Sequence, residues 1–392
     1  MMFEKEIVLL RELHVNGLFS KPFYSIRCNK KSFESYENFK EIKFMHKQEL
    51  RDTNVFERTN SCPKDIFGIF SSRGTTGNKT YYLYNKTDKI VHSECAKTYL
   101  AMLDVTENDL AGVMVPITSC VMGHAMLWQF TAVGAGYVNC ESPSPDNIID
   151  FVSNIPITII ATKPSVASSV VYSPKWAESA KNSHVNKLLL GGDFLSKGRR
   201  KLLENVWGAT CFNLFGMSEL FGPMASECKQ RDGLHYRDDY IFIEVIDPLT
   251  NQPAQNDQKG VAVYTTLWEK GFPLLRYWSD DIVSIKSDSC ACGSSLPRLY
   301  YHGRMADHIY NQGSYIFPEQ VEDILIENGF IGDFKARIKN NKVDILTEAT
   351  GKEFSSHMVE QLNLLFNKNV EVKLVEVNSL NSTGVGNRFE NQ

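Results

Sequence analysis

A short stretch near residue 75 combines the residue types that bind phosphate groups. It reads Ser71-Ser72-Arg73-Gly74-Thr75-Thr76-Gly77-Asn78-Lys79-Thr80. Glycines let the backbone approach a ligand closely, hydroxyl and amide groups donate hydrogen bonds, and Lys79 supplies positive charge. A ligand-free Gly/Thr hairpin is the plain alternative. The nucleotide-binding loop that leads from a strand into a helix is excluded, because the spacing differs and an aromatic run (Tyr81 to Tyr84) follows.

Glycines and charged residues also recur together further along the chain. The stretches are Gly191-Gly192-Asp193, Phe215-Gly216-Met217-Ser218-Glu219, Asp280-Asp281 and Gly303-Arg304. Each has an ordinary structural explanation when taken singly. Glu219 could cap a helix, Asp281 could pair with Arg276 at the surface, and Gly303-Arg304 could form a turn.

Four potential metal ligands form a separate group. They are Cys228, His235, Cys290 and Cys292. Thiolate and imidazole groups that come in pairs are the ligands that tetrahedral Zn²⁺ prefers, and four protein ligands would close the site and make it structural. Free buried thiols are the alternative.

An α/β fold is predicted to carry these residues. From about 111 to 214, strand-like and helix-like runs alternate, which indicates a mostly parallel sheet with helices on both faces. Ligands of such sheets bind beyond the carboxyl ends of the strands, so Gly191–Asp193 and Phe215–Glu219 are expected at one edge. Residues 237–287 read as a small antiparallel β unit, and a compact α+β part follows.

The composition and the charge pattern limit the kinds of partner that are expected. The chain has 392 residues, 43% of them hydrophobic and 22% charged, with a formal net charge of −4. No basic run alternates with aromatic residues and no apolar run approaches the ~20 residues of a spanning helix, so neither nucleic acid nor a membrane is expected as a partner. The charged start of the chain shows no signal peptide. Nine cysteines, an odd number, favour free thiols in a reducing cytoplasm.

Together and in this order, the motifs resemble those of the adenylate-forming superfamily of acyl-CoA synthetases and luciferases. Within it, the chain is similar to the phenylacetate-CoA ligase branch, and the resemblance runs from about residue 20 to the end. The marks of that branch are Phe-Gly-Met-Ser-Glu with Gly-Pro and Ala-Ser-Glu-Cys (215–228), Ile246-Asp247-Pro248, and Gly-Arg followed by Phe-Pro-x-Gln-Val-Glu (303–322).

The resemblance implies a two-domain ligase. Residues 1–303 would form the large domain, with its β-rich part at about 237–300, and residues 304–392 a small domain that moves over the site. A carboxylate would attack the α-phosphate of ATP in the presence of Mg²⁺, and a thiol, usually that of coenzyme A, would then displace AMP. The acid would be an aryl or arylalkyl acid.

The resemblance also implies roles for individual residues. The β- and γ-phosphates would be held by Ser72, Gly74, Thr75, Thr76, Gly77 and Lys79. The base pocket would be lined by Gly191, Gly192 and Asp193, and Phe215 would lie against adenine, with Gly216, Met217 and Ser218 leading toward the phosphates. Glu219 would hold Mg²⁺, Asp281 would accept hydrogen bonds from the ribose hydroxyls, and Arg304 would contact ribose or phosphate.

Two further groups of residues enter through the resemblance. His124, Trp128, Thr162 and Pro164 are candidate walls of the acyl pocket, although His124 could simply be a satisfied helix histidine. Some members of the branch carry a structural zinc at positions similar to Cys228, His235, Cys290 and Cys292. Such a zinc ion would crosslink the β unit beside the nucleotide site.

The chain departs from the family pattern at several positions, among them Asn78-Lys79, where the loop lysine is shifted by one place. Arg73 replaces a serine of the loop, Ala306 replaces an aspartate before Asp307, and Asn387 stands where the family has a lysine that reaches the carboxylate and α-phosphate. Asparagine supplies no positive charge to the transition state. Two alternatives therefore stay open: transfer of the acyl group to a carrier-protein thiol or an amine, and a non-catalytic homologue that binds nucleotide or acyl groups.

Overall fold

The computed structural model describes residues 3–72, 79–118, 120–140, 144–255, 257–311, 314–339, 342–348, 353–376, 380 and 388–391. The chain divides into two compact units. The first comprises Met1–Ser142 and Leu214–Tyr301, and the second comprises Pro143–Asn213 and His302–Gln392. Within the described residues, no helix is both long and apolar enough to cross a membrane.

Antiparallel strands dominate the first unit. The hydrogen-bonded order is β10-β11-β12-β13-β9-β8-β7, β1 pairs antiparallel with β2, and β3 pairs parallel with β4. The strands are β1 (Ile66–Ser71), β2 (Tyr81–Asn85), β3 (Leu110–Val113), β4 (Gly136–Asn139), β8 (Gly222–Ser226), β9 (Leu234–Tyr236), β10 (Ile241–Ile246), β11 (Gly260–Thr266) and β12 (Tyr277–Lys286), with β7 (Thr210–Met217) and β13 (Arg298–Arg304) beginning in one unit and ending in the other.

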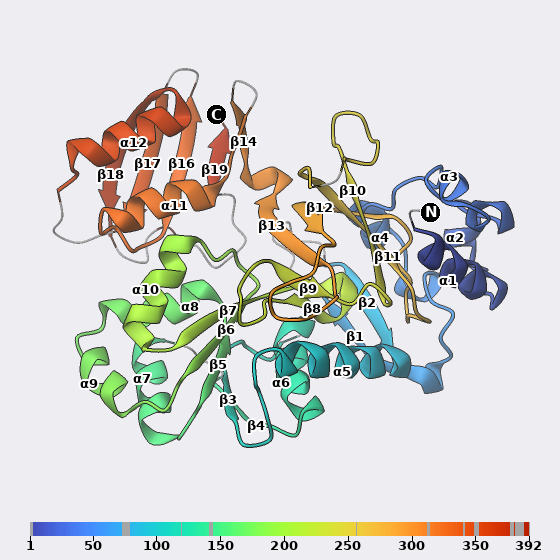
Figure 1. The fold of residues 1–392 in the computed structure, drawn as a ribbon, viewed down its shortest axis with the longest axis horizontal. Coiled ribbons are helices and arrows are strands. Elements are labelled where there is room, and N and C mark those ends of the chain that lie inside the picture. The colour runs from blue at the N-terminus through green and yellow to red at the C-terminus, as the bar shows by residue number, and fades with distance from the viewer. Residues whose placement is uncertain are drawn as a thin grey trace. The chain divides into compact units, whose positions relative to one another are not determined.

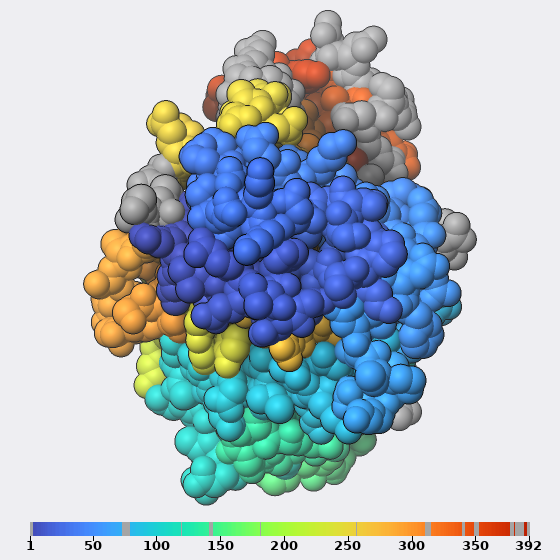
Figure 2. All heavy atoms as spheres, turned by 90° about the vertical axis from the view of Figure 1, so that its right-hand side faces the viewer, coloured from blue at the N-terminus to red at the C-terminus, as the bar shows by residue number. Residues whose placement is uncertain are grey.

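The helices of the first unit are α1 (Glu4–Val15), α2 (Pro22–Ser25), α3 (Tyr36–Phe39), α4 (Lys47–Asp52), α5 (Lys86–Ala101) and α6 (Val121–Ala132). The short N-terminal helices form one continuous surface, blue in Figure 2. They are anchored by stacked aromatic rings, among them Phe19 on Phe33. Helix α5 begins at a capping box, in which Asn85 and Asp88 each accept a hydrogen bond from the other's backbone N–H.

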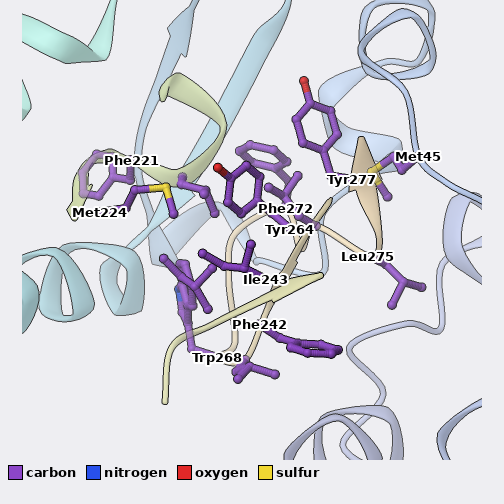
Figure 3. Packing of buried hydrophobic residues seen from close by; sticks show 14 of the residues in the cluster. Met45, Phe221, Met224, Phe242, Ile243, Tyr264, Trp268, Phe272, Leu275 and Tyr277 are labelled. Atoms are coloured by element: carbon purple, nitrogen blue, oxygen red, sulfur yellow. The ribbon is translucent and has the colours of Figure 1, made fainter. Parts of the chain in front are cut away.

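A large aromatic core holds the antiparallel layer together (Figure 3). Every residue of β11 is buried, and Tyr264 on this strand packs with Phe242, Phe272 and Tyr277 in the same cluster. Burying a large apolar side chain contributes about 1.5–3 kcal/mol, so the cluster gives these strands a fixed register against one another.

The second unit is built from two separate parts of the sequence, Pro143–Asn213 and His302–Gln392. Its first part has the parallel pair β5 (Ile159–Thr162) and β6 (Lys187–Gly191) and the helices α7 (Pro145–Asn154), α8 (Pro164–Ser168), α9 (Trp176–Asn182) and α10 (Lys197–Trp207). Proline occupies the first turn of both α7 and α8, where its missing N–H costs nothing.

The C-terminal segment, from His302 onward, has a hydrophobic core of its own. Its four-stranded sheet runs in the order β18-β17-β16-β19, and Figure 1 shows α11 and α12 on one face of β16–β18. The elements are β14 (Ile309–Asn311), β15 (Ser314–Ile316), α11 (Pro318–Glu327), β16 (Phe334–Lys339), β17 (Lys342–Glu348), α12 (Ser356–Phe366), β18 (Asn369–Val375) and β19 (Phe389–Asn391).

The predicted α/β fold and the alternation between 111 and 214 are confirmed, with some corrections. Strand β3 is short and ends at Val113, ahead of Pro116, which has no N–H to donate to a ladder. Strand β12 is longer and covers Tyr277–Lys286. The strands β8, β9 and β13 were not predicted, because their sequences lack a clear alternation of apolar residues.

Candidate active site

The end of β7 turns sharply into the motif that contains Glu219. After Met217 the chain forms a short 3₁₀ turn, Ser218–Leu220, and then returns as β8. A Cβ atom on Gly216 would lie 2.2 Å from the carbonyl oxygen of Gly222, so only glycine fits there. The ring of Phe215, one residue earlier, lies against Tyr301 with centroids 5.1 Å apart. The turn therefore presents Ser218 and Glu219 at the end of a rigid strand.

Glu219 is 4% exposed and is held by three groups from other elements. Its Oε1 accepts hydrogen bonds from the hydroxyls of Tyr82 on β2, at 2.8 Å, and Tyr277 on β12, at 3.1 Å. The ammonium group of Lys47, the first residue of α4, lies 3.3 Å from the same oxygen. A carboxylate with this many donors has a fixed orientation, which makes it suited to holding a cation or a reacting group.

The two tyrosines stay protonated donors. Burial raises the pKa of Tyr82 and of Tyr277, and the negative charge of Glu219 raises both further. The hydroxyl of Tyr84, on the same strand as Tyr82, donates to the carbonyl of Ser218. Three hydroxyls from β2 and β12 thus fix the Ser218–Glu219 turn.

A buried lysine lies behind this turn. Lys270 is 2% exposed, and its ammonium lies 4.5 Å from the centroid of the Tyr84 ring and 4.3 Å from that of Phe272. Its counter-ion is Asp88, at 3.6 Å, which also accepts a hydrogen bond from Trp268 at 2.8 Å. Burial lowers the pKa of Lys270 to about 8, although Asp88 and Glu219 favour the charged form.

Asp281 lies on β12 and is 2% exposed. The suggested surface pair between Asp281 and Arg276 is wrong, because Arg276 is itself buried and bonds Glu244 through two nitrogens, at 2.9 and 3.0 Å. Glu219 does not cap a helix, and Gly303-Arg304 is not a turn but the end of β13. The ordinary explanations of these three motifs therefore do not hold in the structure.

The phosphate-binding candidates lie in the loop between β1 and β2. The backbone N–H of Ser72 donates to the Thr80 carbonyl at 2.8 Å, and the backbone N–H of Thr80 donates to the Ser72 hydroxyl at 3.1 Å. These two hydrogen bonds close the base of the loop. Lys79 is exposed beside it. Gly74, Thr75, Thr76 and Gly77 lie outside the described residues, as does Asn387.

The acyl-pocket candidates divide between the two units. In the first, Trp128 of α6 lies between Phe221 and His124, at ring distances of 5.6 and 5.4 Å. Nε2 of His124 is 3.1 Å from the carbonyl oxygen of Thr118, as expected of a satisfied histidine. In the second, Thr162 ends β5 and Pro164 starts α8, and both are buried.

Charged residues gather around the end of β6 in the second unit. Gly192 follows that strand with a φ of +78°. Burial raises the pKa of the Asp193 carboxyl, against the effect of nearby Arg388 and Lys163. Burial also raises the pKa of Asp307, next to Arg304, Arg388 and Asp193. The structure thus brings Asp193 close to Asp307 and Arg388, from sequence positions over 100 residues apart.

The four predicted metal ligands come together in the first unit. One ligand atom from each of Cys228, His235, Cys290 and Cys292 lies within 4.8 Å of the others. The sulfurs of Cys228 and Cys290 are 3.8 Å apart, and Nε2 of His235 is 3.5 Å from the sulfur of Cys292. His235 Nδ1 donates to the carbonyl of Leu296 at 3.1 Å, so Nε2 is left facing the sulfurs. Pairing of β9 with β13 produces this approach.

No protein-family model matches the sequence. The chain is 27% identical over 314 residues to a phenylacetate-coenzyme A ligase from Thermus thermophilus, an alignment that covers 78% of this chain and 71% of that protein. The corresponding enzyme from Escherichia coli is 20% identical over 314 residues, with 79% and 71% covered. The sequence comparisons thus support the resemblance of this chain to phenylacetate-CoA ligases.

Solved structures of adenylate-forming enzymes share the fold. A 2-hydroxyisobutyryl-CoA ligase in the postadenylation state, in complex with R3-HIB-AMP, superimposes with a TM-score of 0.85 at 20% identity, covering 99% of this chain and 89% of that one. The same enzyme in complex with 2-HIB-AMP and CoA in the thioesterification state gives a TM-score of 0.70 at 20% identity over 99% and 89% of the two chains.

Sequence reasoning missed the partners that position the adenylate-forming motifs. Tyr82 and Tyr84 belong to an aromatic run that reads as an ordinary strand, and Lys47 reads as an ordinary helix start. The pair of Lys270 with Asp88 spans 182 positions, so no local pattern could reveal it. A lysine close to several large apolar residues, as Lys270 is to Trp268 and Phe272, is the one signal that was available.

We expect Lys270 to produce a measurable dependence of stability on pH. In the folded protein its pKa is about 8, against 10.5 in a free chain. Between these values the unfolded state binds more protons, so the stability contributed by this group rises with pH. From pH 7.5 to 9.5, the free energy of unfolding of the wild type should rise relative to that of Lys270→Met by ~2 kcal/mol.

Urea titrations at several pH values would measure this difference. The exposed lysine in Lys86→Met provides a matched control, whose difference from wild type should not change with pH. Parallel pH curves for the wild type and Lys270→Met would contradict the assigned burial of charge.

Proposed function

We propose that the protein is an ATP-dependent ligase that activates a carboxylic acid as an acyl-adenylate and passes the acyl group to coenzyme A. The observation that carries this proposal is the buried Glu219 carboxylate at the end of β7, fixed by Tyr82, Tyr277 and Lys47. The names of the homologues support it. The acid in this proposal is aryl or arylalkyl, as the name of the phenylacetate ligases suggests.

The reaction has two steps. A carboxylate oxygen of the acid attacks the α-phosphorus of ATP, and pyrophosphate leaves. The sulfur of coenzyme A then attacks the carbonyl carbon of the acyl-adenylate, AMP leaves, and the thiol proton passes to solvent. Both steps build negative charge on phosphate oxygens, so donors and cations that are fixed in advance stabilise the transition states.

The residues of the first unit would bind most of the nucleotide. Ser72, Lys79 and the loop residues Gly74, Thr75, Thr76 and Gly77 would hold the terminal phosphates. Phe215 would lie against adenine, followed by Gly216, Met217 and Ser218. Asp281 would accept the two ribose hydroxyls, because an ionised carboxylate takes two hydrogen bonds at once. Gly191, Gly192, Asp193 and Arg304 are the remaining candidates for the base and ribose contacts.

Glu219 is the candidate ligand of Mg²⁺. Carboxylate oxygen is the donor that this ion prefers, and the fixed orientation of Glu219 fits that role. When bound, Mg²⁺ would offset the charge of the phosphates. Lys47, 3.3 Å from the same carboxylate, supplies positive charge at this position in its absence.

The candidate acyl pocket and the domain roles remain part of the proposal. His124, Trp128, Thr162 and Pro164 stay the candidate residues for binding the acid. Residues 304–392 would form a mobile small domain, which gains support from a relative that has been solved in both postadenylation and thioesterification states. All nine cysteines are free thiols, in keeping with a cytoplasmic location.

Asn387 is the main departure from the family. The neighbouring Arg388 is an obvious substitute for the missing lysine, but its guanidinium bonds Asp333 at 3.1 Å and lies over the rings of Phe194 and Phe334. These contacts support a structural role for Arg388. In this proposal adenylation therefore proceeds without the family's lysine contact.

The residues Cys228, His235, Cys290 and Cys292 fit a structural zinc. Ligands 2.3 Å from a tetrahedral ion are about 3.7 Å apart, close to the observed separations and far from a disulfide's. The hydrogen bond from His235 to Leu296 orients the imidazole in the way that metal-bound histidines are usually oriented. Zinc would supply a crosslink between β9 and the turn after β12.

The first test of the function is ATP–pyrophosphate exchange with a panel that includes phenylacetate, benzoate and 2-hydroxyisobutyrate. At least one acid should support exchange, and Glu219→Gln should lower the rate by about 100-fold or more, because it removes a fixed charge at the phosphates. Glu107→Gln, an exposed substitution, is the control.

Thioester formation with coenzyme A should follow with the same acid. Exchange without a thioester would favour a carrier-protein thiol or an amine as the acceptor. ATP binding without exchange for any acid would contradict catalysis and support a non-catalytic binding protein.

Metal analysis tests the proposed zinc site. Protein purified without chelator should contain about one zinc per chain, and Cys290→Ser should lose it and melt at a lower temperature, because a structural metal contributes directly to stability. Cys62→Ser changes an exposed cysteine outside the cluster and should keep the metal. A metal-free wild type that takes up no added zinc would rule the site out.

Asn387→Lys tests the missing lysine contact. A restored positive charge should raise the exchange rate by about 10-fold or more, since such contacts act in the transition state. Asn108→Lys adds the same charge to an exposed turn and should have no effect. An unchanged rate in Asn387→Lys would mean that other residues already supply this charge.

A further inference from the structure

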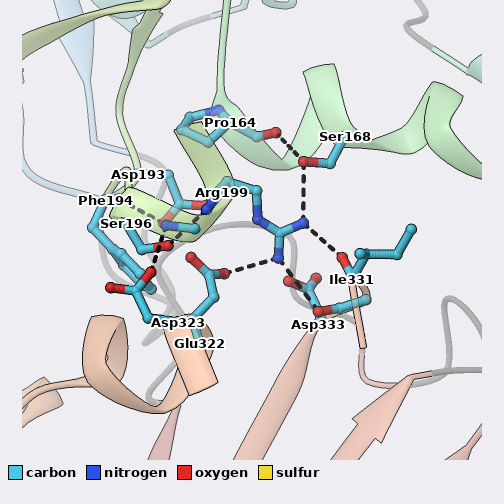
Figure 4. Close-up of polar contacts among 12 residues, drawn as sticks. Pro164, Ser168, Asp193, Phe194, Ser196, Arg199, Glu322, Asp323, Ile331 and Asp333 are labelled. Carbon is cyan, nitrogen blue, oxygen red and sulfur yellow. Dashed lines mark hydrogen bonds and ion pairs between the residues drawn. The ribbon is translucent and has the colours of Figure 1, made fainter. Parts of the chain in front are cut away.

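A buried ion pair in the second unit joins α10 to the C-terminal segment (Figure 4). Arg199 is 4% exposed and Glu322, on α11, is 3% exposed. Nη2 of Arg199 donates to Oε1 of Glu322 at 2.8 Å. Nη1 donates to the carbonyl of Ile331 at 2.7 Å and to the hydroxyl of Ser168 on α8 at 3.2 Å. The Arg199 guanidinium on α10 thus bonds Ser168 of α8 and also Glu322 and Ile331 of the C-terminal segment.

Further bonds extend the contact. The backbone N–H of Gly198 donates to Oδ1 of Asp323 at 2.6 Å, and a Cβ atom on Gly198 would come within 2.9 Å of the same oxygen. Nη1 of Arg388 is 3.8 Å from Glu322, and its Nη2 bonds Asp333. Burial by itself would raise the pKa of Glu322, but the two arginines bring it below its usual value, so the carboxylate is charged.

The contact reaches the candidate base-binding loop. Ser196 caps helix α10, and its hydroxyl accepts a hydrogen bond from the Arg199 N–H at 3.0 Å. Gly191–Asp193 end three residues before this cap, and Arg388 lies over Phe194 with 5.0 Å between guanidinium carbon and ring centroid. The C-terminal segment is therefore held directly beside residues proposed to bind the nucleotide.

Buried ion pairs are well suited to holding an arrangement that must also be released. Both charges have water as an alternative partner once they are separated, whereas an apolar contact of the same size strongly resists exposure. Removing one partner leaves the other charge buried and uncompensated, which disfavours the bound arrangement specifically.

We propose that Arg199 and Glu322 are positioning residues that hold the C-terminal segment against α8 and α10 while the acyl-adenylate forms, and that this pair separates before the thioester forms. The inference rests on the proposed ligase function. It identifies residues that touch neither ATP nor the acid but control which half-reaction the chain can perform.

The test measures the two half-reactions separately in Arg199→Gln and Glu322→Gln. ATP–pyrophosphate exchange, with the acid that the wild type uses fastest, should fall at least 10-fold in both. Thioester formation from the synthetic adenylate of that acid and coenzyme A should stay within two-fold of wild type. Arg199→Lys keeps the charge and should recover a large part of the exchange rate. Lys201→Gln, an exposed substitution on the same helix, should change neither rate.

Other results would overturn the inference. An equal fall in both half-reactions, at equal folded fraction by circular dichroism, would show a merely structural pair. Unchanged exchange in both glutamine variants would show that the pair has no role in adenylation. Wild-type exchange is measured first, so a failure of the proposed function is seen there and is not confused with a failure of this inference.

Discussion

The first unit depends on a negative charge held inside an aromatic core. Glu219 is brought out of water at the end of β7, where its carboxylate would be unstable without compensation. The hydroxyls of Tyr82 and Tyr277 and the ammonium of Lys47 provide that compensation from β2, β12 and α4. The strands must keep their register for the three donors to converge, so the packing of the core and the geometry of the site are a single requirement.

The same solution recurs at three other buried cations of the described residues. Lys270 is paired with Asp88, Arg276 with Glu244, and Arg199 with Glu322, each pair lying between elements that are distant in sequence. Such pairs add little net stability compared with apolar residues, but they tolerate only one arrangement of their elements. Two of them lie in the first unit. The third lies in the second unit, between α10 and α11, where exchange between arrangements would serve the reaction.

The most consequential departure from the adenylate-forming family is in the C-terminal segment. The motif around Glu219 is complete, whereas the lysine of the C-terminal segment is replaced by Asn387. Arg388, next to it, is occupied by Asp333 and by two aromatic rings. The chain thus resembles the family around Glu219 and departs from it at a residue to which the resemblance assigns a role in the first step. That combination is why half-reaction kinetics are more informative than an overall rate.

The sequence by itself determined the fold class, the alternation of strands and helices in the central part, and the motifs that point to an adenylate-forming enzyme. These are local properties: apolar periodicity, proline and cap residues at helix starts, and glycines where the backbone must turn closely. It also identified Cys228, His235, Cys290 and Cys292, because their residue types are distinctive even when far apart.

Only the tertiary structure decided which groups complete the site. Tyr82, Tyr277 and Lys47 are ordinary residues in ordinary segments, and they acquire a role because strand pairing brings them to one carboxylate. The same holds for Arg199 and Glu322, 123 positions apart, whose charges become informative once both are seen to be buried. Long-range pairing and burial depend on the whole chain, so no pattern within a short window can encode them.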